Sequence, residues 1–98
     1  MQISVRRSGG FAGLTEQLAT VDTEKLDPVR AERLAEAVRQ SDFFRQPADF
    51  PGPAGADLFR YEVTVTDEGR SHTVAYADSD DAESATVRRL VEAVMNAP

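Results

Sequence analysis

The clearest pattern in the chain lies in residues 58–66, where apolar and polar residues alternate strictly from Phe59 onward. The apolar members on one side of this segment are Phe59, Tyr61, Val63 and Val65. A period of two residues is typical of a β-strand that buries one face and exposes the other to water. Residues 70–77 are predicted to return as a partner strand with His72, Val74 and Tyr76 on one face, and Asp67-Glu68-Gly69 lies between the two segments. Because Gly69 can adopt the left-handed conformation of a hairpin bulge, we predict that the two strands form an antiparallel hairpin.

Two other segments show the period of an amphipathic helix. Asp27 followed by Pro28 is a typical helix start, because the aspartate accepts from free backbone N–H groups and proline suits the first helical position. An apolar stripe with i, i+3, i+4, i+7 spacing then runs to about Gln40 and consists of Ala31, Leu34, Ala35 and Val38. A second helix is predicted from about Asp80 to Met95, since Asp80 and Glu83 have the spacing of a capping box. Its stripe has the same spacing and consists of Val87, Leu90, Val91 and Val94.

The N-terminal part of the chain carries weaker strand signals. Ile3 and Val5 alternate with polar residues, which predicts a short half-buried strand. Residues 15–22 also favour a strand, but their apolar positions do not keep one phase, so we expect a bulge or an edge position there. Phe43 and Phe44 follow the first helix and are expected to anchor its end in the core. Residues 46–56 are rich in proline and glycine and predict a loop that crosses the domain.

These elements predict a single small α+β domain that comprises residues 1–98. Their order is β-β-α-β-β-α. The simplest two-layer arrangement of this order is an antiparallel sheet of about four strands with two helices on one face. The residues expected to be mostly buried lie in the apolar stripes and are Leu34, Val38, Phe59, Tyr61, Val63, Leu90, Val91 and Val94.

The composition excludes several classes of function. The chain has 98 residues and a formal net charge of −6, whereas nucleic-acid binding needs a clustered basic surface. It has no cysteine, so neither disulfides nor thiolate zinc sites can form. No apolar stretch approaches the ~20 residues of a membrane span, and residues 1–7 lack the pattern of a signal peptide. We therefore expect a soluble cytoplasmic protein that binds neither nucleic acid nor a membrane.

Catalysis is not expected either. His72 is the only histidine, and it lies mid-strand in phase with Val74 and Tyr76, where a structural role is the better interpretation. The acidic residues near the start of the second helix complement the helix dipole and do not have the ligand spacing of a calcium loop. The glycines near the N-terminus lack the Lys-Ser/Thr of a phosphate-binding loop. We predict neither a metal site nor a cofactor.

The most informative segment is the glycine-rich run Arg7-Ser8-Gly9-Gly10-Phe11-Ala12-Gly13-Leu14. Clustered glycines mark backbone that turns sharply or that other groups approach closely. One interpretation is a β-hairpin turn whose Phe11 folds back onto the sheet. The other is a loop that inserts Phe11 or Leu14 into the groove of a partner.

This segment is part of a resemblance to the emfourin family of small bacterial proteins. The resemblance also includes Asp42-Phe43-Phe44, the run Gly55-Ala56-Asp57 that leads into the strand from Phe59, and Asp67-x-Gly69-Arg70 followed by His72-Thr73-Val74. It extends over nearly the whole chain and is most specific over residues 8–14 and 56–74. The family comprises proteinaceous inhibitors of thermolysin-like zinc metallopeptidases such as protealysin. The resemblance therefore implies that this chain is such an inhibitor and is not an enzyme.

The resemblance and the glycine-rich segment imply the same partner-binding residues. A thermolysin-like cleft selects a large apolar side chain just after the cleavage point, so a preorganised loop that carries Phe11 or Leu14 would suit that pocket. The binding residues implied are Ser8, Gly9, Gly10, Phe11, Ala12, Gly13 and Leu14. Two alternatives remain: a protein-interaction module with a different partner, and a small enzyme or ligand carrier with a closed pocket of convergent polar groups.

Overall fold

The secondary structure follows the predicted order, with one additional strand. The computed structural model describes residues 1–9, 14–51, 58–79 and 81–96. The strands in these ranges are β1 (Gln2–Gly9), β2 (Glu16–Asp22), β3 (Asp49–Phe50), β4 (Phe59–Asp67) and β5 (Arg70–Ala77). The α-helices are α1 (Pro28–Ser41) and α2 (Ala85–Met95), and the short 3-10 turns are η1 (Thr23–Lys25), η2 (Phe43–Arg45) and η3 (Ala82–Ser84).

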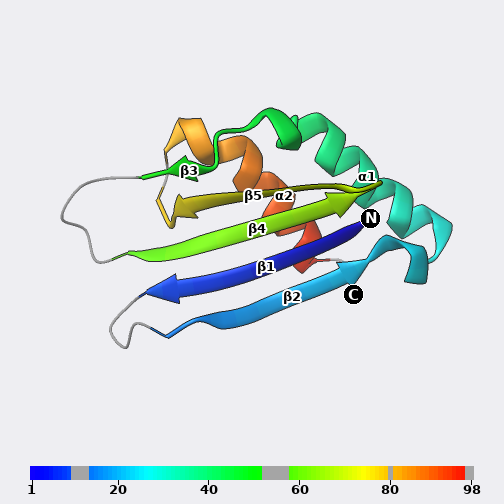
Figure 1. Cartoon of the computed structure of the whole chain (residues 1–98), viewed down its shortest axis with the longest axis horizontal. Helices are drawn as coiled ribbons and strands as arrows, with labels where there is room; N and C mark the ends of the chain where they lie inside the picture. Colours follow the sequence, from blue (N-terminus) through cyan, green and yellow to red (C-terminus); the bar gives the residue numbers. More distant parts are fainter. Residues whose placement is uncertain (10–13, 52–57, 80, 97–98) are drawn as a thin grey trace.

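The strands form one sheet in the order β2-β1-β4-β5-β3. The pairs β1–β2 and β4–β5 are antiparallel hairpins, and antiparallel pairing of β1 with β4 joins them. Both helices pack on the same face of this sheet (Figure 1), which confirms the predicted α+β architecture. The sheet has five strands rather than about four, because Asp49 and Phe50 add a short strand parallel to β5. Two residues within a proline-rich segment carry no strand pattern, so β3 was not predictable from alternation.

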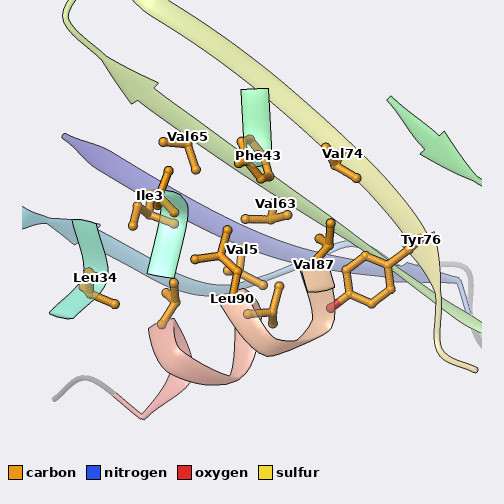
Figure 2. Packing of buried hydrophobic residues seen from close by; sticks show 13 residues of the cluster. Ile3, Val5, Leu34, Phe43, Val63, Val65, Val74, Tyr76, Val87 and Leu90 are labelled. Atoms are coloured by element: carbon orange, nitrogen blue, oxygen red, sulfur yellow. The ribbon is translucent and has the colours of Figure 1, made fainter. Parts of the chain in front are cut away.

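The core lies between the sheet and the two helices. Side chains at matching positions of neighbouring strands form rows across the sheet, and one such row is Val5, Val63 and Val74. Leu34 and Leu90 approach these rows from α1 and α2 (Figure 2). The buried cluster comprises Ile3, Val5, Leu34, Val38, Phe43, Val63, Val65, Val74, Tyr76, Val87, Leu90, Val91 and Val94.

Most of the predicted core residues are buried, namely Leu34, Val38, Val63, Leu90, Val91 and Val94. Tyr61 is half-buried and stacks on Tyr76, with 5.4 Å between the ring centroids. The prediction for Phe59 is wrong, because 38% of this residue is exposed. Phe59 lies on the helix-facing side of β4, but it is the first residue of the strand, at an end of the sheet that the helices do not cover (Figure 1).

β2 is an edge strand and contains a bulge, as its irregular pattern predicted. Val5 of β1 pairs with Ala19, whereas the next residue, Arg6, pairs with Gln17. Leu18 is therefore an extra residue between the two pairs, and the phase of β2 changes around it. This explains why no single alternation fits residues 15–22.

The turn between β4 and β5 is tighter than predicted. Asp67 pairs with Arg70, so only Glu68 and Gly69 connect the strands. Both connecting residues have positive φ, 50° and 81°, which is the pattern of a two-residue type I′ turn. The left-handed conformation of Gly69 is confirmed, but the predicted hairpin bulge is replaced by this shorter turn.

The first helix begins as predicted, and the second begins later than predicted. The side chain of Asp27 caps α1 and accepts a hydrogen bond of 3.0 Å from the backbone N–H of Arg30. In the second helical segment, the 3-10 turn η3 comes first, and the N-cap of α2 is Ser84, which makes no side-chain capping bond. Ser84 is buried and its Oγ donates to the carbonyl of Asp81 at 3.3 Å. The α-helix is therefore not capped by the predicted box, of which Asp80 lies outside the described residues.

Phe43 and His72 connect the end of α1 to the sheet. Phe43 is buried, and its ring makes edge contacts with Phe44 and His72 at centroid distances of 5.8 and 5.5 Å. His72 Nε2 lies 2.7 Å from the carbonyl oxygen of Gln46. Because a carbonyl only accepts, Nε2 donates this hydrogen bond. The predicted anchoring by Phe43 is confirmed, and the contacts of His72 are those of a structural residue.

Candidate functional site

The predicted binding segment connects β1 and β2 at one end of the sheet. Ser8 and Gly9 are the last residues of β1, and Leu14 precedes β2. Leu14 is 68% exposed, the highest value among the exposed large apolar residues of the described chain. The other predicted binding residues lie outside the described residues and are Gly10, Phe11, Ala12 and Gly13. The segment therefore begins on β1 and ends just before β2, and its last residue presents an apolar side chain to solvent.

Gly9 is required by the fold itself. It pairs directly with Phe59 of β4 and has a φ of 92°, a conformation that side chains rarely adopt. A Cβ atom at this position would lie 3.3 Å from the carbonyl oxygen of Leu58, which is closer than ordinary van der Waals contact. Glycine at position 9 thus allows β1 and β4 to approach closely at the base of the binding segment.

Arg7 lies on the helix-facing side of the sheet and contacts the strands on either side of β1, next to the start of the glycine-rich segment. It pairs with Glu16 across the β1–β2 hairpin, and its Nη2 lies 2.8 Å from Glu16 Oε1. Its guanidinium also lies over the ring of Phe59, 4.5 Å from the centroid. Hydrogen bonding to Glu16 and then to Tyr61 raises the pKa of Arg7, so the group stays charged. These contacts hold β1, β2 and β4 together where the glycine-rich segment begins.

Phe59 is a site residue that sequence reasoning missed. The alternation in β4 correctly places it on the same side as Val63, but alternation does not show how far the helices extend over that side. In Figure 1 the left-hand ends of β1, β2 and β4 extend past the helices. Phe59 and Leu14 therefore expose apolar surface at the end of the sheet where β1 leads into the binding segment.

The two larger of the depressions seen elsewhere in the described residues bear on the alternative of a ligand carrier. One, about 640 Å³, follows the outer side of α1 between Pro28 and Gln40. The other, about 400 Å³, lies near the end of α1 and contains three arginines. Each arginine already has a partner in the fold: Arg39 with Glu32 and Glu36, Arg45 with Asp42, and Arg70 with the ring of Phe44. Neither depression is the closed pocket with free convergent groups that this alternative requires.

The described residues contain no group of three or more His, Cys, Asp or Glu side chains that could hold a metal ion. Within the same ranges, neither helix has the length and apolar character needed to cross a membrane. The two charged side chains where the segment meets β1 and β2 are those of Arg7 and Glu16, which bind each other. The site therefore offers exposed apolar side chains on a braced backbone, which is a surface suited to contact with another macromolecule.

The fold and the site thus define a small α+β domain with a candidate protein-binding end. Residues 5–95 match the model of the emfourin family, and the chain belongs to this family. Emfourin is the family of protealysin inhibitors, so membership implies a protease-inhibitor role. No curated protein and no solved structure matches the chain.

Proposed function

We propose that this protein inhibits thermolysin-like zinc metallopeptidases of the protealysin type. In this proposal the glycine-rich segment, residues 8–14, enters the substrate cleft and blocks it. The observation that carries the proposal is the family match over residues 5–95. The 68% exposure of Leu14, beside the braced end of the sheet, supports the choice of this segment.

The structure around the segment favours a preorganised inhibitor. A flexible loop loses conformational entropy when it binds, and a loop held at its base loses less. Gly9 fixes one end of the segment in close register with β4, and the Arg7–Glu16 ion pair links the two strands that the segment connects. A segment held at its ends in this way is also less able to adopt the geometry in which a peptidase cleaves a bound peptide.

The energy of binding should concentrate in one or two apolar side chains of the segment, as is usual at protein interfaces. Phe11 and Leu14 are the candidates, and Phe11, at the centre of the glycines, is our choice for the main anchor. Leu14 is largely exposed, so its removal should leave the stability of the free protein unchanged. A loss of inhibition on Leu14→Ala would then report a lost contact with the peptidase.

The test is to measure inhibition constants and melting curves for Phe11→Ala and Leu14→Ala. At least one variant should weaken inhibition about thirtyfold, equivalent to ~2 kcal/mol, with an unchanged melting temperature. Val29→Ala is the matched control, because Val29 is 61% exposed on α1 and lies away from the segment. If both segment variants inhibit as strongly as the wild type, the glycine-rich segment is not the inhibitory element.

A further inference from the structure

Phe59 and Arg7 are in contact at the end of the sheet where β1 pairs with the beginning of β4, and we call this place the Phe59 corner. Because Gly9 is the direct neighbour of Phe59 on β1, no side chain stands opposite the phenyl ring on that side, while on the other side the backbone N–H of Asp78 donates to the carbonyl of Phe59 at 2.9 Å. The guanidinium of Arg7 lies over the ring instead, and Glu16 holds the guanidinium from β2. The result is a stacked pair of planar groups on β1 and β4 that Glu16 of β2 holds in place, and residue Phe59 is 38% exposed.

This corner has two features that do not favour the stability of the free protein. An aromatic side chain on the helix-facing side remains partly in water, although its burial would be favourable. In addition, Arg7 Nε is buried and has no hydrogen-bond acceptor among the described residues. A buried N–H without an acceptor is costly, so this atom does not add to the stability of the free protein. Both features lie directly beside the proposed inhibitory segment, since Gly9 begins that segment and pairs with Phe59.

We propose that Phe59, held by Arg7 and Glu16, is a second contact element of the inhibitor. This inference rests on the proposed function. While residues 8–14 occupy the substrate cleft, the exposed part of the Phe59 ring packs against an apolar side chain on the rim of the same peptidase. Aromatic and arginine side chains are enriched at protein interfaces, and a ring whose position is already fixed loses little entropy on binding. Arg7 acts as a positioning residue that orients the ring.

The first test compares inhibition constants for variants that keep or remove the ring. Phe59→Ala should weaken inhibition at least tenfold, whereas Phe59→Tyr, which keeps the ring, should stay within about threefold of the wild type. Val29→Ala should again leave inhibition unchanged, because it removes exposed apolar surface at a distant site. If folded Phe59→Ala inhibits as strongly as the wild type, the second contact element does not exist.

The positioning role of Arg7 has a separate readout. In a double-mutant cycle, Arg7→Lys should weaken inhibition several-fold in the wild-type background but have little further effect when Phe59 is already alanine. A lysine keeps the charge but lacks the planar group that lies over the ring. Equal effects of Arg7→Lys in both backgrounds would show that Arg7 does not act through Phe59.

A second measurement detects the contact directly and does not depend on the affinity of an alanine variant. Because the chain has no cysteine, Phe59→Cys and Val29→Cys each introduce a single thiol. With saturating peptidase, alkylation of the thiol at position 59 should slow at least tenfold, while the thiol at position 29 should react at its free rate. An unprotected thiol at position 59 in the inhibited complex would overturn this inference alone. A wild-type protein that does not inhibit the peptidase would overturn the proposed function, and this inference with it.

Discussion

Replacing Gly9 by alanine tests the structural basis of the proposed inhibitory segment. The φ of 92° at Gly9 is unfavourable for any residue with a Cβ atom, and such backbone strain costs about 1–3 kcal/mol. The added Cβ would also lie 3.3 Å from the carbonyl oxygen of Leu58, so β1 and β4 must separate slightly. Crowding of this kind adds on the order of 1 kcal/mol, and the lower entropy of the unfolded alanine chain offsets roughly 0.4–1 kcal/mol.

The expected net loss for Gly9→Ala is about 2 kcal/mol, which lowers the melting temperature by about 8–16 °C in a domain of this size. Gly69→Ala is the matched control. Gly69 has a similar φ of 81°, but a Cβ there meets no atom within 4 Å. Its expected loss is about 1 kcal/mol, from backbone strain alone, and about 4–8 °C in melting temperature.

Thermal unfolding followed by circular dichroism gives both melting temperatures, and a peptide-hydrolysis assay gives both inhibition constants. Gly9→Ala should also weaken inhibition, because it disturbs the strands that hold the glycine-rich segment. Gly69→Ala should not, because its turn joins the opposite ends of β4 and β5. Equal melting temperatures for the two variants would refute the crowding argument, and unchanged inhibition by Gly9→Ala would refute its link to the binding segment.

Two further predictions concern the rest of the fold. His72→Gln removes the hydrogen bond to Gln46 and the edge contact with Phe43, so it should cost ~1 kcal/mol of stability and leave inhibition unchanged; a folded variant that no longer inhibits would show that the histidine is functional. The pKa of Asp27 is lowered, first by the hydrogen bond that it accepts from the backbone of Arg30. Its contribution to stability is therefore complete above the unfolded pKa near 4 and disappears as the pH falls through the lower folded-state pKa. Asp27→Asn keeps a capping oxygen but does not titrate, so its melting temperature should fall less than that of the wild type between about pH 4 and pH 2.

The sequence predicted an element well where a single local effect, such as burial of one face or one capping hydrogen bond, determines its pattern. The alternation of β4 and the stripes of the two helices reflect the partition of side chains between core and water, the Asp27 cap reflects one local hydrogen bond, and all three appear in the structure. The irregular pattern of β2 also had a specific cause, the extra residue Leu18. Such features depend on neighbours in sequence and are therefore visible in it.

The parts that sequence did not predict depend on contacts between distant segments. β3 exists because Asp49 and Phe50 lie beside β5, and no pattern of their own marks them as a strand. Phe59 has the alternation of a core residue but lies beyond the helices, so its exposure follows from how the layers are placed. The Arg7–Phe59 contact likewise depends on the pairing of β1 with β4. The likeness to a known family, by contrast, was visible in the sequence, and the family match confirms it.

The proposed function is inhibition of a thermolysin-like metallopeptidase by occupation of its substrate cleft. The most direct measurement is a titration of the purified protein against protealysin and thermolysin in a peptide-hydrolysis assay, with trypsin as a control of a different catalytic class. We expect inhibition of at least one of the two metallopeptidases that is competitive with substrate and saturates at one inhibitor per enzyme, while trypsin is unaffected. Full activity of both metallopeptidases in the presence of excess folded protein would contradict it.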